Sequence, residues 1–492
     1  VRRTGSPCKV HRIGASGFAG LVRVCLPLLL VSLARSVDCR TPRVAIIGSG
    51  VGGSGTAYYL KEKLPDVDIV VFEKNEEPGG RTHTIQFAGI TVDTGATSVS
   101  TLNEYLVEII NKFNLSEPES QEQTTSRTKP ASEAIGIWDG TAFVFQSSTS
   151  MWELLPKLFY RYGMSVWRMR KATQDAVSRL SQIYSLQKAG VAFDSPRTMF
   201  EELGLWLIAQ QSAYDYFEDQ QVSSKFLHEF ADAASRCNYL QEGDINAVVD
   251  AVSLAGAGLV GSVFSLPKGT EQLPRALLKA AQVDLQLSAR VTAVETDAAG
   301  FKVVLAGNQS AGPAFDAVVV ATPLPGAHIK LPTTQELNLP EYQTVHVTLV
   351  AGILAKSYFG TLRDLPTEIF TKAGEANFNS IGLKGYTDEG VPVYKIFSHQ
   401  QLSRPLLDTL FEGVVDIERL VWPAAYPKLQ PVPVWPDFDL THSGLHYLNA
   451  MESAISCMET ELIAAKNLAI TLSRRLRAPP PCAPNEEQCV TK

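Results

Sequence analysis

The sequence predicts an α/β fold in which a Rossmann-type dinucleotide-binding domain is interrupted by an inserted α+β domain. An apolar, β-branched run at 44–47 leads directly into the glycine-rich stretch 48–53. A second apolar run ends at Glu73, twenty residues past the last of these glycines. Strand, glycine turn, helix, second strand and acidic residue thus follow in the order of a dinucleotide-binding βαβ unit. Helical periodicity over about 152–234 separates this unit from a return to α/β texture at Leu266.

Each part of the glycine motif has a physical role in binding a nucleotide. Gly48 permits a tight turn out of the strand, Gly50 lets the backbone approach a pyrophosphate, and Gly53 lets the helix sit close to the sheet. The helix N-terminus offers free N–H groups and positive dipole charge to the phosphates. Glu73 can accept hydrogen bonds from ribose hydroxyls. The motif therefore predicts a bound nucleotide cofactor.

The remaining elements of the N-terminal part follow from periodicity and turn residues. We expect strands at 44–48 and 68–73 and helices at 53–64 and 102–113. A turn-rich loop is expected at 78–84, and a polar, mobile surface loop at 116–133.

The middle of the chain is expected to be helical, over 152–186, 199–209 and 223–234. Apolar residues fall on one face of the first helix, at Trp152, Leu155, Phe159 and Tyr162. The same region carries positive charge, at Lys157, Arg161, Arg168, Arg170 and Lys171. The apolar face is either a core face, a wall of an apolar substrate pocket, or a patch facing a membrane or lipoprotein.

The C-terminal part is expected to form strands at 286–295, 301–305, 315–323 and 445–449, with mixed strand and loop at 342–396 and a final helix at 454–475. Cys457 and Met458 on that helix are expected to be packing residues. We assign 43–140, 263–335 and 430–476 to a discontinuous nucleotide-binding domain, 141–262 and 336–429 to a substrate domain, and 477–492 to a disordered tail.

Charge, cysteine spacing and short targeting motifs limit the classes of function and the cellular location that we expect. The 492 residues carry a net charge of −7 without a basic block, which argues against nucleic-acid binding. No C-x-x-C pair occurs among the seven cysteines, so we expect no metal site of that kind. Residues 1–36 contain a short apolar core after Arg23 and are expected to be a signal peptide region. Sequons at Asn114 and Asn308 agree with the secretory pathway, either the lysosomal lumen or secretion.

Several further segments carry a family resemblance. They are Gly79-Gly80-Arg81, Asn238-Tyr239, Asp244-Ile245-Asn246-Ala247, 316–323, Lys395-Ile396-Phe397-Ser398 and Tyr447-Leu448-Asn449-Ala450-Met451-Glu452. With the 44–73 unit, they make the chain similar to the FAD-dependent amine-oxidase-like flavoproteins and, among these, to the prenylcysteine oxidase family. The resemblance spans about 43–475. One departure is Ala450, where the family carries a glycine.

The resemblance implies an amine-oxidase-like two-domain architecture with FAD as the cofactor. It places FAD against Gly48, Ser49, Gly50, Gly52, Gly53, Glu73, Lys74, Gly80, Arg81, Val291 and Glu452. It also implies cleavage of a farnesyl- or geranylgeranyl-cysteine thioether to cysteine, an isoprenoid aldehyde and hydrogen peroxide, with O₂ as the second substrate. The flavin performs the hydride abstraction, so no side-chain catalytic residue is assigned. A tunnel for the isoprenoid is expected near 152–167 and 254–264.

Two alternatives stay open at this point. One is a different lumenal FAD oxidase acting on amines. The other is a prenyl-binding protein or a catalytically altered paralogue. The isoprenoid preference, the linkage of FAD and the oligomeric state are not determined by the sequence.

Overall fold

The computed structural model describes residues 40–116, 134–147, 151–334, 336–361, 364–372 and 376–477, without the side chains of 151–155. The expected signal peptide region lies outside these residues. So do nearly all of the expected polar loop and of the expected disordered tail.

A five-stranded parallel sheet forms the centre of the nucleotide-binding part, in the order β19-β13-β1-β2-β9. Its strands are β1 (Arg43–Ile47), β2 (Asp68–Phe72), β9 (Asp284–Gln286), β13 (Ala317–Val320) and β19 (Leu445–Tyr447). β1 and β13 are almost completely buried, as parallel strands covered on both faces must be. The predicted α/β Rossmann-type fold is therefore confirmed.

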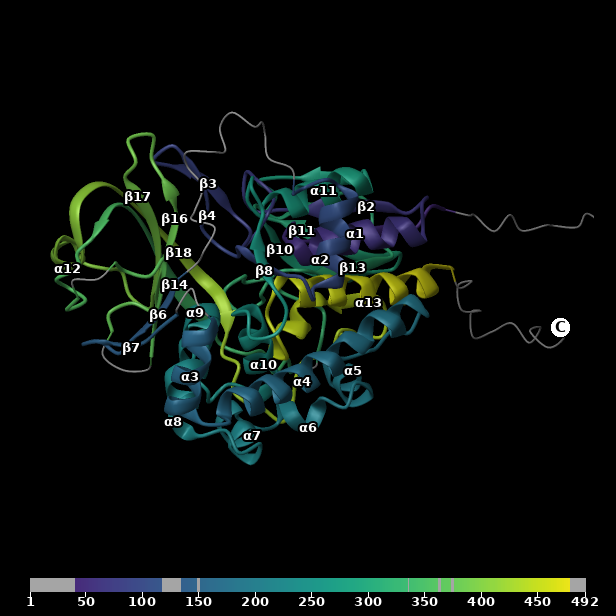
Figure 1. Cartoon of the computed structure of the whole chain (residues 1–492). Helices are drawn as coiled ribbons and strands as arrows, with labels where there is room; N and C mark the ends of the chain where they lie inside the picture. The colour runs from purple at the N-terminus through teal and green to yellow at the C-terminus, as the bar shows by residue number, and fades with distance from the viewer. Residues whose placement is uncertain are drawn as a thin grey trace, which may run out of the picture. The chain divides into compact units, whose positions relative to one another are not determined.

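Helices from distant parts of the sequence pack beside this sheet (Figure 1). α1 (Val51–Lys63) contacts both α11 (Gln272–Ala281) and α13 (Met458–Arg477), the long yellow helix. α2 (Glu104–Lys112) also packs on α13. The C-terminal helix therefore joins the first βαβ unit to the rest of the chain.

A seven-stranded sheet forms the second part, in the order β18-β14-β17-β16-β15-β6-β7. Its strands are β6 (Ile135–Trp138), β7 (Phe143–Gln146), β14 (Tyr342–Leu354), β15 (Glu368–Thr371), β16 (Ser380–Tyr386), β17 (Pro392–Ser398) and β18 (Phe411–Pro427). The β6–β7 hairpin pairs with β15, although it lies more than two hundred residues earlier in the chain. The expected domain boundary at residue 140 is therefore wrong, because it cuts this hairpin and leaves β6 outside its own sheet.

A group of helices lies below the two large sheets in the view of Figure 1. They are α3 (Met151–Tyr162), α4 (Ser165–Lys188), α5 (Pro196–Glu202), α6 (Trp206–Ala209), α7 (Ala213–Asp219), α8 (Ser224–Phe226), a π-helical turn (Leu227–Ala231), α9 (Asp232–Tyr239) and α10 (Ala247–Gly256). Side-chain caps begin several of them: Asn246 accepts the N–H of Val249 at 3.0 Å at the start of α10. The expected apolar face of α3 is not uniform, because Tyr162 is buried while Phe159 is 55% exposed.

Two expected elements differ from the structure. The expected strand 286–295 is two strands in different sheets, β9 and β10 (Val291–Asp297), because the chain turns at Ser288, which has φ +52°. The final helix begins at Met458 rather than near residue 454. A 3₁₀ segment, Leu448–Ser453, precedes it and accommodates Ala450 without a positive φ.

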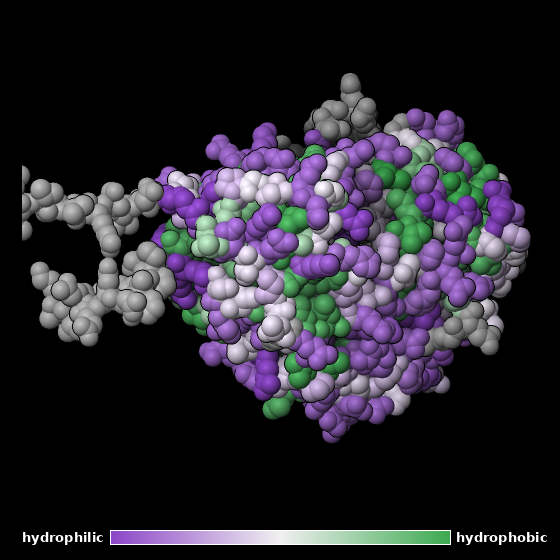
Figure 2. All heavy atoms as spheres, turned by 180° about the vertical axis from the view of Figure 1, so that it is seen from behind, coloured by the Kyte–Doolittle hydropathy of each residue, from purple (hydrophilic) through white to green (hydrophobic). Residues whose placement is uncertain are grey.

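The remaining elements are short. β3 (Thr84–Phe87) pairs with β4 (Ile90–Asp93), β5 (Ser98–Ser100) pairs with β8 (Val263–Ser265), β11 (Gly300–Leu305) lies between β10 and β12 (Gln309–Ser310), and α12 (Arg404–Leu410) precedes β18. The face shown in Figure 2 is mainly hydrophilic with separate apolar patches. Within the described residues, no helix combines the length and apolarity needed to cross a membrane.

Candidate active site

The turn between β1 and α1 has the conformation that a dinucleotide-binding motif requires. Gly48 has φ +108°, and a Cβ there would lie 2.4 Å from the carbonyl oxygen of Ala321, so a side chain does not fit. A Cβ on Gly53 would lie 2.0 Å from the oxygen of Gly48. α1 begins at Val51 without a side-chain cap or an acidic residue in its first turn. Its first N–H groups are therefore available to an anionic ligand.

Glu73 lies beside this turn at the end of β2. Its carboxylate accepts hydrogen bonds from the backbone N–H of Ser49 at 3.1 Å and from the Ser49 hydroxyl at 2.6 Å. The backbone oxygen of Glu73 accepts the N–H of Ala289 at 2.7 Å, shortly before β10 begins at Val291. The structure therefore brings Ser49, Glu73 and the chain leading into Val291 together, as a nucleoside-binding edge requires.

The loop after β2 approaches the glycine turn backbone to backbone. Gly80 has φ +58°, and a Cβ there would lie 3.2 Å from the Cα of Gly50. Glycine main chain from both loops thus faces a shared space, which suits a pyrophosphate. Gly80 and Lys74 are both exposed.

Two of the predicted cofactor-binding residues, Arg81 and Glu452, form an ion pair although they lie near opposite ends of the chain. The Glu452 side chain is fully buried, and it also accepts hydrogen bonds from the Tyr342 hydroxyl at 2.5 Å and the Asn449 amide at 3.0 Å. Burial by itself raises the pKa of Glu452, but the Arg81 guanidinium outweighs this and holds the pKa below its ordinary value. Glu452 therefore fixes a cation beside the glycine loops.

Gly52 has a packing role that the sequence analysis did not predict. A Cβ there would lie 2.4 Å from Oε2 of Glu461 and 2.5 Å from the Leu448 side chain. The missing side chain lets α1 lie against α13. Burial, together with the nearby Glu452 carboxylate, holds the pKa of Glu461 well above its ordinary value. This shift favours the neutral form of Glu461 next to the phosphate-binding turn.

These residues fit a dinucleotide cofactor such as FAD. Glu73 would bind the adenosine ribose, the glycine loops and the α1 N-terminus would hold the pyrophosphate, and the Arg81–Glu452 pair would lie toward the flavin side. Direct contacts of the predicted residues with FAD stay a prediction.

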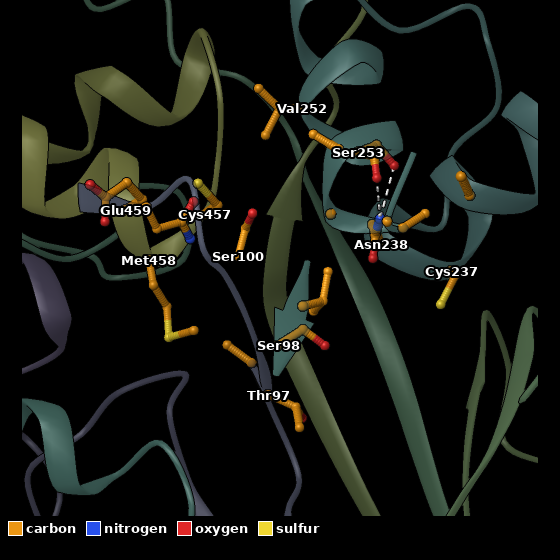
Figure 3. Close-up of a pocket in the computed structure, with 18 of the residues that line it drawn as sticks. Thr97, Ser98, Ser100, Cys237, Asn238, Val252, Ser253, Cys457, Met458 and Glu459 are labelled. Atoms are coloured by element: carbon orange, nitrogen blue, oxygen red, sulfur yellow. Dashed lines mark hydrogen bonds between the residues drawn. The ribbon is translucent and has the colours of Figure 1, made fainter. Parts of the chain in front are cut away.

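A cavity of about 630 Å³ lies between the seven-stranded sheet and the helices. In Figure 3, Ser98 and Ser100 of β5 lie between the start of α13, with Cys457 and Met458, and the α9 residues Cys237 and Asn238. Apolar residues in the cavity lining include Val177, Leu180, Val252, Phe264, Met458 and Ile463. Charged and polar residues of β15 and β16 also line it, among them Glu368, Ser380 and Lys384.

The cavity reaches the cofactor-binding residues through the segment after β4. Ala96 lines the cavity and donates its N–H to the backbone oxygen of Arg81 at 3.1 Å. A Cβ on Gly95, which also lines the cavity, would lie 1.9 Å from that same oxygen. The Arg81 guanidinium donates at 3.0 Å to the carbonyl of Ala425, the neighbour of the lining residue Tyr426. The cavity wall at Gly95 and Ala96 therefore contacts Arg81, one of the predicted cofactor-binding residues.

Lys395, on β17, holds the segment that lies between the cavity and Arg81. Its ammonium group donates to the backbone oxygens of Asp93 at 2.8 Å and Gly95 at 3.3 Å, and to the Thr97 hydroxyl at 2.8 Å. Burial, with a smaller contribution from nearby Lys384, lowers the pKa of Lys395 to about 7. Lys395 thus ties β17 to the segment that separates the cavity from Arg81.

One of the two stretches that were expected to line an isoprenoid tunnel contributes to the cavity wall. Ala255, Gly258 and Phe264 line the cavity, as expected for 254–264. Within the described side chains of the predicted stretch 152–167, none lines it, because the chain enters the cavity wall later, on α4. Cys457 and Met458 also line the cavity and are not simply packing residues; burial raises the pKa of the Cys457 thiol.

The sequence analysis missed the charged residues Lys395, Glu368 and Lys384. The signal was present for Lys395, because a lysine stands among apolar residues in a strand-like run and a buried lysine needs partners. Glu368 and Lys384 carry no such local signal. The two sequon asparagines, Asn114 and Asn308, lie in exposed turns with φ +54° and +61°.

Comparisons with known proteins agree with this architecture. Residues 144–480 match a family model described as prenylcysteine lyase, and residues 46–113 match an NAD(P)-binding Rossmann-like domain. The chain is 31% identical over 473 residues to a farnesylcysteine lyase from Arabidopsis thaliana, covering 92% of each chain. It is 30% identical to human prenylcysteine oxidase 1, covering 94% of this chain and 95% of the relative.

Solved structures with a similar fold include two amine oxidases. Putrescine oxidase bound to putrescine superposes with a TM-score of 0.57 at 15% identity, over 88% of this chain and 99% of that chain. Cyclohexylamine oxidase from Brevibacterium oxydans gives a TM-score of 0.54 at 15% identity, over 89% and 100%. The predicted amine-oxidase-like architecture is confirmed.

Proposed function

Because the chain belongs to the prenylcysteine lyase family, we propose that it is an FAD-dependent oxidase that cleaves the thioether of farnesyl- or geranylgeranyl-cysteine. Water supplies the oxygen of the isoprenoid aldehyde and O₂ accepts the two electrons, so the products are cysteine, the aldehyde and hydrogen peroxide. The names of two relatives, farnesylcysteine lyase and prenylcysteine oxidase 1, support this substrate class.

The observation that carries the proposal is a cavity lined by both apolar and charged side chains, whose lining residue Ala96 donates its N–H to the backbone oxygen of Arg81. Its volume, about 630 Å³, lies within the range typical of small-molecule sites. A fifteen-carbon farnesyl chain at roughly 0.8 kcal/mol per buried CH₂ contributes about ten kcal/mol of gross driving force before ordering costs. An amphiphile is therefore the class of ligand that this lining favours.

In this proposal the chain's residues bind and orient, and the cofactor supplies the redox chemistry. A bound flavin would accept a hydride from the carbon next to sulfur. Leu180 and Ile463 would hold the isoprenoid, and Lys395 would keep the Gly95–Thr97 backbone in place beside the reacting carbon.

Anaerobic spectroscopy of the purified protein tests the proposal. The protein should show a flavin spectrum that bleaches on addition of farnesylcysteine and recovers with O₂ as peroxide forms. S-dodecylcysteine, which lacks the allylic carbon, serves as the matched control and should not bleach it. Bleaching by putrescine but not by farnesylcysteine would instead establish an amine oxidase. A flavin spectrum that neither compound bleaches would indicate a catalytically altered paralogue.

We also propose that the chain enters the secretory pathway and is glycosylated at Asn114 and Asn308. The exposure of both asparagines supports this. Glycosidase treatment of protein secreted from animal cells should increase its electrophoretic mobility, and Asn114→Gln with Asn308→Gln should abolish the change.

We further propose a peripheral contact with an anionic membrane surface at the junction of α3 and α4. Large apolar side chains are exposed there: Phe159 55%, Tyr160 94%, Met164 49% and Trp167 39%. Exposed basic residues flank them, at Lys157, Arg168 and Lys171. Tyr160→Ser with Met164→Ser should reduce sedimentation with phosphatidylserine vesicles, while Leu207→Ser, at another exposed apolar site, should not.

A further inference from the structure

The charged side chains of the cavity differ in how deeply they are buried. Among the described lining residues, four are charged: Glu368, Lys384, Lys395 and Glu459. Lys395 donates to three oxygen acceptors. Glu459 accepts the N–H groups of Tyr105 and Leu106, each at 2.9 Å, and the Tyr184 hydroxyl at 2.8 Å. These two residues serve the fold.

The Glu368–Lys384 pair is held differently. Its hydrogen bond is long, at 3.4 Å, and its side chains keep 14% and 22% of their surface accessible. Gly382, opposite Glu368 in the register of β15 and β16, has no side chain, and the ends of the pair occupy the space that one would fill. A Cβ there would lie 2.3 Å from Glu368 Oε2 and 2.6 Å from Lys384 Nζ. The sheet therefore presents one negative and one positive group side by side to the cavity.

We propose that the Glu368–Lys384 pair binds the zwitterionic head of an S-alkylated amino acid, with Glu368 accepting from the α-ammonium group and Lys384 donating to the α-carboxylate. This inference rests on the proposed function, since it assigns the polar end of the same substrate. A ligand with adjacent positive and negative groups can form two charge-assisted hydrogen bonds at once.

The position of the pair agrees with the direction of the cavity. Lys395, Gly382 and Glu368 lie in register on the adjacent strands β17, β16 and β15. The backbone at Glu368, which would bind the head group, therefore lies two strand spacings of about 4.8 Å each from the backbone at Lys395. A head group held at Glu368 leaves the thioether near that junction and the tail against Leu180 and Ile463.

Binding of inert analogues to the FAD-loaded protein tests the assignment separately from turnover. The probes are S-dodecylcysteine, 3-(dodecylthio)propionic acid, which lacks the ammonium group, and 2-(dodecylthio)ethylamine, which lacks the carboxylate. By titration calorimetry, Glu368→Gln should weaken S-dodecylcysteine binding about tenfold or more and leave the acid within about twofold. Lys384→Met should weaken S-dodecylcysteine similarly and leave the amine unchanged.

Two further variants complete the design. Gly382→Ala displaces only the mobile ends of the pair and should weaken S-dodecylcysteine binding without loss of folding. Lys356→Met removes an exposed ion pair with Asp364 in the connection between β14 and β15 and should change nothing. Equal weakening of all three ligands, or no weakening, overturns the head-group assignment. Selective weakening without turnover of farnesylcysteine by the wild-type protein would refute the proposed oxidase activity and leave the head site standing.

Discussion

Replacement of the buried Asp250 by asparagine should change how the stability of the protein depends on pH. Asp250 lies in α10, where its Oδ1 accepts the hydroxyl of Ser235 and its Oδ2 has no hydrogen-bond partner among the described residues. Burial raises the pKa of Asp250 from 3.8 to about 7, and the nearby carboxylate of Asp232 adds to the rise. Asp250→Asn keeps the shape and removes the titration.

The direction of the pKa shift of Asp250 determines whether the protein gains or loses stability as pH rises. Between about pH 4 and pH 7 the unfolded state loses the proton of Asp250 while the folded state keeps it, so the wild-type protein loses stability as pH rises. At about 1.36 kcal/mol per pKa unit, the total loss is about 4 kcal/mol at most. The two proteins should be equally stable near pH 4, and the variant should be more stable above pH 7.

Urea denaturation of both proteins with saturating FAD, at several values between about pH 4.5 and pH 8, measures this difference. A free-energy difference between the two proteins that stays constant across this range would refute the reasoning, because it would mean that Asp250 ionises in the folded state as it does in the unfolded one.

The remaining predictions concern the cofactor and the cavity. Gly53→Val should destabilise the protein by about 1–3 kcal/mol and abolish FAD binding, measured by melting temperature and flavin content, because its Cβ meets a backbone oxygen. Glu73→Gln should weaken FAD binding about tenfold by fluorescence titration, since one charge-assisted hydrogen bond is lost; unchanged affinity would exclude the ribose contact. Leu180→Trp should raise KM for geranylgeranylcysteine more than for farnesylcysteine, and an equal rise would mean that the tail lies elsewhere. Lys395→Met should remove an inflection near pH 7 from the kcat/KM profile, and a profile without that inflection in the wild-type protein would contradict the lowered pKa.

The βαβ unit was predictable from residues 44–73 because its determinants are local. The β-branched run specifies a strand, and the glycines specify a turn that no side chain can enter. The position of Glu73 at the end of the next strand follows from its separation in sequence. The structure reproduces all of these features because each depends on neighbours within one supersecondary unit.

The cavity, the Arg81–Glu452 ion pair and the packing role of Gly52 were decided by the tertiary structure alone. Arg81 and Glu452 are 371 residues apart, and the order of the parallel strands brings them together. Glu368, Gly382 and Lys395 share a row only because three strands pair in one register. Periodicity states which side of a strand or helix a residue occupies, but not what lies opposite, so Phe159 could be placed on an apolar face and still be exposed.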